Sequence, residues 1–339
     1  MLEHTQCLQE MMRKMMNKRN KMKRDGFSSR LLLFMKKNVG FPFTRIKQLK
    51  KGVWLLVGKS ETWIAKEFVS LSKLKLQMAF TAALAKNEFK QSYIFYPQPL
   101  IVEDRIFGLI QYIKPSRMNE FHYHSTTNIN DAFMLMENFH CSTSQFVSSF
   151  IKEIPLFDQI IKWEKRLKVF NELLSQHQQA RYYSTLKSFS YIGEWALERM
   201  KCNSLYFMKE PHCIIHGDVA YHNFIRDENN KLHLIDFDLI AIAPSKIDII
   251  QFCNRILPSL QWNENALFQF PQLRPYRECE AFLTALVYPT DIFREWNQFF
   301  RQNSRKRQTQ LIYLENMTFE LLKERLHFYK AMMKKIDTL

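Results

Sequence analysis

The spacing of apolar and polar residues divides the chain into two regions. Between residues 45 and 112, apolar residues recur with a period of two, which is typical of β-strands. This pattern predicts five strands, over residues 45–50, 53–57, 63–68, 100–102 and 107–112. Gly58-Lys59-Ser60-Glu61 predicts a hairpin turn between the second and third strands, and a helix is expected over residues 70–86.

Helical patterns dominate the remainder of the chain. They predict helices over residues 128–140, 157–176, 179–201 and much of 276–339. Thr127 or Asn128 is the expected N-cap of the first of these helices. The fold class is therefore α+β, with a small antiparallel sheet and a larger, mainly helical part. The predicted divisions are a basic helical extension, the sheet domain and the helical domain, over residues 1–44, 45–113 and 114–339.

Residues 213–238 contain the candidate chemistry. Three short apolar runs predict strands in one small sheet, and each run ends on polar residues. Asp218, Asn223 and Asp236 should therefore converge at one end of that sheet. Two carboxylates and an amide oxygen are hard ligands, which suit Mg²⁺ and not a Zn²⁺ site. The alternative is an ordinary loop with turn residues, which explains Asp227 and Asn229 but not aspartates at the ends of buried strands.

The spacing of these residues matches a known pattern. His216 and Asp218, with Asn223 five residues later, reproduce the kinase catalytic loop H-R-D-x-x-x-x-N, and Asp236-Phe237 fits the metal-binding D-F-G. Gly217 stands in place of the loop arginine, and Asp238 stands in place of the D-F-G glycine. With these two differences, the segment resembles the aminoglycoside phosphotransferase and choline kinase branch of the kinase-like proteins.

This resemblance implies a bilobal protein kinase-like fold and transfer of the γ-phosphoryl group of ATP to a hydroxyl of an unidentified small molecule. Asp218 would orient and deprotonate the hydroxyl, while His216 would order the loop through hydrogen bonds. Asn223 and Asp236 would hold Mg²⁺, with Asp238 assisting.

The resemblance also implies nucleotide contacts in the N-lobe. Lys66 would hold the α- and β-phosphates, Gly52 would lie in the phosphate-covering turn, and the backbone of Gln111 and Ile113 would meet the adenine. Two features depart from the pattern. The turn has one glycine, and the helix over 70–86 has no glutamate to pair with Lys66, Gln77 being nearest to the expected place.

Two further positions in the helical part match the family pattern. Asp248 resembles an aspartate that braces the catalytic loop from behind, although an acidic residue in the first turn of a helix has a purely helical explanation too. His140 lies near the end of a predicted helix, and we interpret it as a packing residue and not a catalyst.

A narrower resemblance is to the spore coat-associated kinase-like proteins of endospore-forming bacteria. It rests on Lys50-Lys51-Gly52-Val53-Trp54 and on a late helix that begins after Leu286-Val287-Tyr288-Pro289. It implies spore coat proteins as partners. The rival function is accordingly that of a non-catalytic coat or scaffold protein with a kinase fold, which the two N-lobe departures favour and the complete Asp218, Asn223 and Asp236 set opposes.

The net charge of +16 is concentrated near the N-terminus. Residues 1–51 contain fourteen Lys and Arg against three acidic residues, an excess of +11, which leaves +5 for the rest of the chain. This basic arm could bind phosphates, a membrane surface or an acidic protein, or could be a solvated helix or disordered. Nucleic acid is not an expected partner, because no aromatic residue interrupts the basic run over 1–24 and no known motif organises the charge.

Localisation is inferred from what the sequence lacks. It has no run of eighteen apolar residues and no secretory signal pattern. The six cysteines show no C-x-x-C or other metal spacing, which predicts reduced, buried thiols. We therefore expect a cytoplasmic protein without a transmembrane segment, with the spore coat as the alternative location.

Overall fold

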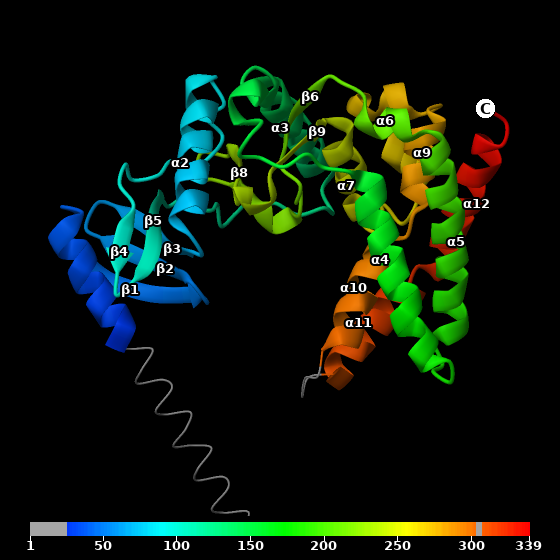
Figure 1. Ribbon diagram of the computed structural model, residues 1–339, viewed down its shortest axis with the longest axis horizontal. Coiled ribbons are helices and arrows are strands. Elements are labelled where there is room, and N and C mark those ends of the chain that lie inside the picture. Colours follow the sequence, from blue (N-terminus) through cyan, green and yellow to red (C-terminus); the bar gives the residue numbers. More distant parts are fainter. Residues whose placement is uncertain (1–25, 303–306) are drawn as a thin grey trace, which may run out of the picture. The chain divides into compact units, whose positions relative to one another are not determined.

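A computed structural model describes residues 26–302 and 307–339, which form two compact units (Figure 1). The first, here called the sheet unit, contains the described residues up to Lys86 and the segment Ser92–Lys114. The second, the helical unit, contains Asn87–Gln91 and the described residues from Pro115 onward. The division after Lys114 lies one residue from the predicted boundary at 113.

The sheet unit is built on five antiparallel strands in the order β1-β2-β3-β5-β4. Their bounds are β1 Phe43–Lys50, β2 Val53–Gly58, β3 Thr62–Phe68, β4 Leu100–Val102 and β5 Arg105–Gln111. All five predicted strands are present, with ends within two residues of the predicted ones. The turn between β2 and β3 closes through a hydrogen bond from Gly58 N to Glu61 O (2.7 Å), as the hairpin prediction required.

The two faces of this sheet are covered by different helices. A helix over residues 26–38 contributes Leu31 and Met35 to the apolar core that also contains Trp54 and Ala65 from the strands. Helix α2 (Leu71–Lys86) lies against the opposite face, because a Cβ atom on Gly108 would come within 2.6 Å of a methyl of Leu74.

Residues 26–44 therefore pack as part of the sheet unit, whereas the sequence interpretation placed them in an extension that ended at 44. The Arg105 guanidinium lies 3.9 Å from the Phe27 ring centroid, and Arg30 pairs with Glu103 at 2.5 Å. Apolar packing, one cation–π contact and one ion pair tie this helix to the sheet unit. The rest of the predicted basic helix, residues 1–25, lies outside the described residues.

The helical unit consists of helices of very different lengths. They are α3 Thr126–Ser144, α4 Gln159–Leu174, α5 Tyr183–Cys202, α6 Ser204–Met208, α7 Lys246–Ile256, α8 Glu264–Phe268, α9 Glu280–Val287, α10 Thr290–Arg301, α11 Arg307–Phe319 and α12 Leu322–Ile336. The predicted N-cap of α3 is wrong, because Ser125 has an extended backbone and its Oγ accepts from Asn128 N (3.3 Å). The helix therefore begins at Thr126, and it continues past His140 to Ser144.

Two separate strand pairs lie among these helices, where the sequence predicted one small sheet. β6 (His212–Ile215) pairs with β9 (Ala241–Pro244), and β7 (Phe224–Arg226) pairs with β8 (Leu232–Leu234). The prediction was wrong because it overlooked the apolar run that forms β9, which is buried along its whole length. β6 therefore pairs with that strand and does not join the β7–β8 hairpin.

Aromatic packing joins α4 to the segment between α9 and α10. The rings of Trp163 and Tyr288 stack with centroids 4.2 Å apart, and the Tyr288 hydroxyl donates to Trp163 O (2.7 Å). Asn297 on α10 donates its amide to Arg166 O on α4 (2.9 Å). These contacts fix α4 and α10 side by side.

No helix within residues 26–302 and 307–339 has the length and apolar character needed to cross a membrane. The five cysteines in the described part of the chain are all free thiols. Cys213 and Cys253 are buried as expected, but Cys141 and Cys202 are exposed, so the expectation of buried thiols was wrong for those two.

Candidate active site

The β7–β8 hairpin places two of the predicted metal ligands at the same end. Phe224 pairs with Leu234, and Ile235 N donates to Asn223 O at 2.9 Å. Asn223 and Asp236 flank these paired residues, so both lie at the open end of the hairpin. The predicted convergence thus occurs, although through one hairpin and a loop instead of a three-stranded sheet.

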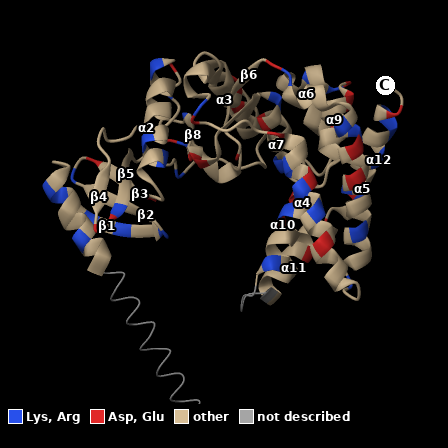
Figure 2. Ribbon diagram, in the orientation of Figure 1, with Lys and Arg blue, Asp and Glu red and all other residues tan. Residues whose placement is uncertain are grey.

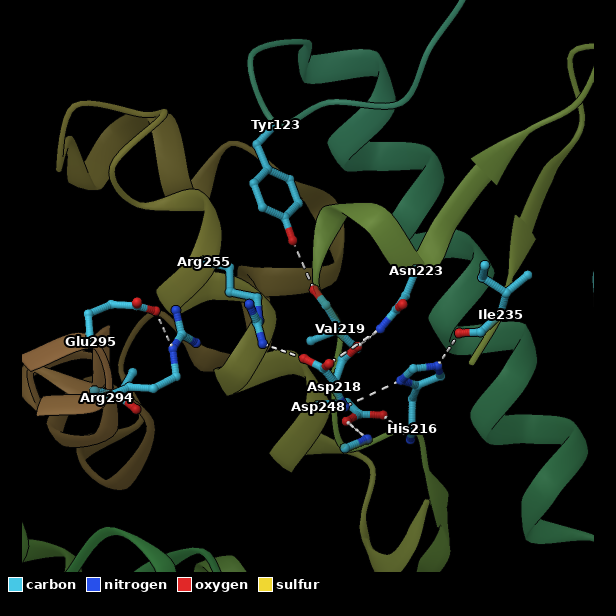
Figure 3. Close-up of polar contacts among 12 residues, drawn as sticks. Tyr123, His216, Asp218, Val219, Asn223, Ile235, Asp248, Arg255, Arg294 and Glu295 are labelled. Atoms are coloured by element: carbon cyan, nitrogen blue, oxygen red, sulfur yellow. Dashed lines mark hydrogen bonds and ion pairs between the residues drawn. The ribbon is translucent and has the colours of Figure 1, made fainter. Parts of the chain in front are cut away.

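Asp218 joins this group through its contact with Asn223 (Figure 3). The side-chain amide of Asn223 donates to the carbonyl oxygen of Asp218 at 2.8 Å and lies 3.4 Å from its carboxylate Oδ2. Because the amide nitrogen is used in this way, the Oδ1 atom of Asn223 is the one that would bind a cation.

Asp248 holds the start of the catalytic loop. It lies in the first turn of α7, is fully buried, and accepts from His216 N (2.7 Å) and Gly217 N (3.0 Å). Burial alone would raise its pKa, but the hydrogen bond with His140 (2.9 Å) and those from the loop backbone hold the pKa below its ordinary value. Of the two explanations open from sequence, the structure shows the brace. His140 is buried and packs behind the loop.

His216 connects the loop to the strand end that leads to Asp236. Its Nε2 lies 2.9 Å from Ile235 O, and its Nδ1 accepts from Asp218 N at 3.3 Å. Complete burial lowers the pKa of the imidazole. The ring is therefore neutral with its proton on Nε2, an arrangement suited to ordering the loop and not to proton transfer.

Glycine is the one residue type that fits at position 217. Its φ angle is +76°, and a Cβ atom there would lie 2.2 Å from the carbonyl oxygen of Leu239. The loop and the segment that follows Asp236 thus touch backbone to backbone. This contact excludes the arginine that a protein kinase loop would carry here.

Asp236 adopts a left-handed backbone conformation, with φ 68° and ψ 70°. For a residue other than glycine this costs about 1–2 kcal/mol, and such strain clusters at functional sites. The next residue, Phe237, is buried and stacks on Phe139 with centroids 5.9 Å apart, which fixes the strained turn. Asp238 is exposed in the short 3₁₀ helix Phe237–Leu239, and its assistance to the metal stays a prediction.

The donor set fits Mg²⁺ that is shared with phosphate groups. Within residues 26–302 and 307–339, no group of three His, Cys, Asp or Glu side chains could hold a metal ion alone. The site instead offers the Asn223 amide oxygen and the Asp236 carboxylate. Mg²⁺ typically binds to one or two carboxylates and completes its shell with water and substrate phosphates.

The predicted nucleotide-contacting residues all lie in the sheet unit. Lys66 pairs with Gly108 in the sheet register and so lies on the face covered by α2, with its Nζ 5.4 Å from the Phe68 ring centroid. Gly52 has φ +77° in the turn between β1 and β2, and Gln111 ends β5 with Ile113 two residues beyond. Their roles toward ATP stay predictions.

Sequence reasoning missed Arg255, whose Nη2 lies 2.5 Å from Asp218 Oδ1. It also missed Tyr123, whose hydroxyl donates to Val219 O at 2.9 Å. A signal for Arg255 was available: it follows Asp248 by seven residues, which is two helical turns, so both lie on one side of α7. Nothing in the sequence around Tyr123 indicated its contact.

Comparison with known proteins gives structural matches only. No protein-family model and no curated protein matches the sequence. Among solved structures, an aminoglycoside phosphotransferase from Alicyclobacillus acidocaldarius matches with a TM-score of 0.67 at 12% identity, covering 88% of this chain and 94% of the other. Spectinomycin phosphotransferase in complex with ADP and spectinomycin matches with a TM-score of 0.61 at 13% identity, covering 88% of this chain and 98% of the other. The GDP complex of an aminoglycoside 2′-phosphotransferase mutant matches with a TM-score of 0.60 at 14% identity, covering 88% of this chain and 97% of the other.

The chain has a kinase-like fold. The predicted fold class, an α+β kinase-like protein with a small antiparallel-sheet lobe and a larger, mainly helical lobe, is confirmed. At these identities the likeness shows the fold and nothing finer. Kinship with the spore coat subgroup stays a prediction.

Proposed function

We propose that this protein is a Mg²⁺- and ATP-dependent phosphotransferase that acts on a hydroxyl group of a small molecule. The observation that supports this best is the junction of Asp218, Asn223 and Asp236, made by the bonds from Asn223 to Asp218 and from Ile235 to Asn223. A loop that serves only as a turn would not need the buried Asp248 to hold its backbone, or a strained backbone at Asp236.

Each residue of the site has a separate role in the proposed reaction. Asp218 orients the acceptor hydroxyl and receives its proton, while Arg255 fixes the direction of the carboxylate. Asn223 and Asp236 would hold Mg²⁺, which neutralises charge on the phosphates when it is bound. Lys66 would bind the α- and β-phosphates. Phosphoryl transfer depends mainly on positioning and charge neutralisation, and these groups would supply both.

Turnover measurements test this proposal. ADP release should be followed over a panel of hydroxyl compounds with Mg²⁺ and ATP, using wild type, Asp218→Ala and the exposed-carboxylate control Glu153→Gln. We expect Asp218→Ala to lower kcat by about 10²–10⁴-fold, since a positioned acid–base group contributes that much, and Glu153→Gln to leave it unchanged. Wild-type turnover in Asp218→Ala would overturn the assignment.

A second candidate is a non-catalytic scaffold protein, of the spore coat or elsewhere, with a kinase fold. Two features favour it: the β1–β2 turn contains only Gly52, and α2 contains no glutamate. Such a protein would show no ADP release above the Asp218→Ala level with any acceptor.

A further inference from the structure

Four basic side chains gather around the ion pair between Arg255 and Asp218, and the proposed reaction uses only one of them. Lys162 and Arg166 come from α4, Arg255 from α7 and Arg294 from α10. Figure 2 shows Lys and Arg segments on α4 and α10, the helices that Asn297 joins through its bond to Arg166 O. We call these four residues the basic cluster.

One member of the basic cluster binds the catalytic aspartate directly, and a second lies beside that member. Arg255 binds Asp218 Oδ1, and in Figure 3 the side chain of Arg294 lies next to that of Arg255. Arg294 pairs with Glu295 at 2.8 Å. Burial, followed by the charge of Arg294, lowers the pKa of Arg255, so the two guanidinium groups repel each other. Arg255 is half-buried, with 23% of its side chain exposed, whereas 40% of the Arg294 side chain is exposed.

The other two members lie one helical turn apart on α4. Arg166 donates to the hydroxyl (2.5 Å) and the carbonyl oxygen of Thr290, which are neutral partners. Lys162 Nζ lies 4.5 Å from the Phe157 ring centroid. In the part of the chain that the structure describes, neither side chain has a carboxylate within ion-pair distance.

Burial and the neighbouring charge of Arg166 lower the pKa of Lys162 to about 8. The charges of Asp218 and Arg255 also act on Lys162, which ties the α4 pair electrostatically to the catalytic aspartate. The basic cluster is therefore continuous from α4 through α7 to α10.

Charge within this region does not balance. Four cations face the carboxylates of Asp218 and Glu295. The charge of Asp248 is already taken up by His140 and two backbone N–H groups, and that of Asp291 by Arg325. Holding excess positive charge in a partly buried place costs free energy unless an anion balances it. Forked guanidinium groups and an ammonium group are also the side chains best suited to bind oxyanions.

We propose that the acceptor carries an anionic oxyanion group, a phosphate or a carboxylate, which Lys162, Arg166 and Arg294 bind while its hydroxyl meets Asp218. This inference rests on the proposed function. In the reaction, the bond between the γ-phosphorus and the β–γ bridging oxygen breaks and a bond from the γ-phosphorus to the acceptor oxygen forms. Asp218 takes the hydroxyl proton, and ADP leaves with the bridging oxygen. A cationic acceptor would be repelled by the basic cluster.

Inorganic phosphate and acetate are the probes that test this site. Melting temperature should be measured against each anion at constant ionic strength, with saturating Mg·ADP present so that nucleotide phosphate positions are filled. We expect phosphate, acetate or both to stabilise wild type, and Lys162→Gln and Arg166→Gln to weaken that response at least tenfold. The comparison of the two anions distinguishes a phosphate group from a carboxylate.

Two controls separate charge from folding. Lys165→Gln removes an exposed charge from the same helix and should respond as wild type does, and Lys162→Arg keeps the charge and should retain the response. Equal anion responses in wild type, Lys162→Gln and Arg166→Gln, or no response in wild type, would overturn the inference. Mg·ADP should itself raise the melting temperature of wild type. If it does not, while the anion response still depends on Lys162 and Arg166, the result would contradict the proposed phosphotransferase activity and not this inference.

Discussion

The catalytic loop at Asp218 and the β1–β2 turn at Gly52 are both short connections assigned to phosphate chemistry, but they are held very differently. The loop is bonded from behind by Asp248, from the side by His216 and in front by Asn223. The turn is held by the hairpin and by one bond, from Glu67 N to Gly52 O (2.7 Å). The loop is therefore fixed by the fold, whereas the turn depends on its strands alone.

The conformation of the chain is more constrained at the loop than at the turn. The loop is bonded to the buried Asp248 of α7, which His140 of α3 bonds in turn, and to Ile235 O at the end of β8, so that few conformations are open to it. In the turn, only the backbone at Gly52 and the charged side chains of Lys50 and Lys51 would be available to bind a phosphate. The proposed activity should accordingly be sensitive to changes behind the loop and tolerant of changes in the turn.

The largest effect is expected from removing the brace behind the loop. Asp248→Ala leaves two backbone N–H groups and His140 buried without their acceptor, which should lower the free energy of unfolding by about 3–5 kcal/mol. Urea unfolding measures this. Asp158→Ala is the matched control, because Asp158 caps α4 at the surface (2.9 Å to Ile161 N) and should cost about 1 kcal/mol. Equal costs would contradict the assignment of Asp248 as the buried brace of the loop.

A pair of glycines with the same backbone angle isolates the close contact within the loop. Gly217 and Gly40 both have φ +76°, but a Cβ atom would strike Leu239 O at Gly217 and would meet nothing within 4 Å at Gly40. Gly40→Ala should lower the free energy of unfolding by about 1 kcal/mol through backbone strain alone. Gly217→Ala should cost about 2 kcal/mol more and abolish turnover. A similar cost at both positions would contradict the backbone contact.

The buried His216 predicts how stability changes with pH. Its folded pKa lies below the ordinary value of 6.5, so the unfolded chain binds a proton there more readily. The stabilisation is complete above pH 6.5 and is lost as the pH falls below it, by up to about 1.4 kcal/mol per pH unit. Asp248, with a lowered pKa, contributes stability that is lost only as the pH falls below its ordinary value of 3.8.

Unfolding measured between pH 7.5 and 5 tests this prediction. His216→Gln keeps a donor for Ile235 O but cannot titrate, so its stability should change less over this range than that of wild type. His124→Gln, at an exposed histidine, should follow wild type. Parallel curves for all three proteins would show that His216 does not carry the pH dependence.

The smallest effect is expected from restoring a carboxylate in the sheet unit. Gln77→Glu supplies the acidic partner that α2 lacks for Lys66, and we expect the KM for ATP to fall by about threefold to tenfold. Adding Lys66→Met should abolish that gain. If Gln77→Glu only lowers the melting temperature, the buried carboxylate lacks a partner, and the sheet unit does not follow the kinase pattern at this place.

The strands of the sheet unit and the residues of the loop could be predicted because local sequence specifies them. Period-two alternation sets β1 to β5, and fixed offsets identify Asp218, Asn223 and Asp236. Residues 26–44 were placed in the basic extension because their Lys and Arg residues belong to the charge excess of residues 1–51, although Leu31 and Met35 are buried. Their packing depends on strands that follow later in the chain.

The partners of the loop were harder to predict because they come from distant segments. The pairing of β6 with β9 spans about thirty residues, and Arg255 reaches Asp218 from α7. The basic cluster joins three helices, and no spacing within one segment indicates it. Tertiary packing decides these contacts, and composition gives no sign of them.

A Mg²⁺-dependent nucleotide site that includes Asp236 predicts that Mg·ATP raises the melting temperature of the protein. A ligand present at a hundred times its Kd stabilises the folded state by about 2.7 kcal/mol. We predict a rise of several degrees for wild type and for the exposed control Glu153→Gln, and none for Asp236→Asn. Equal melting temperatures with and without millimolar Mg·ATP in wild type, or an equal rise in Asp236→Asn, would contradict the claim.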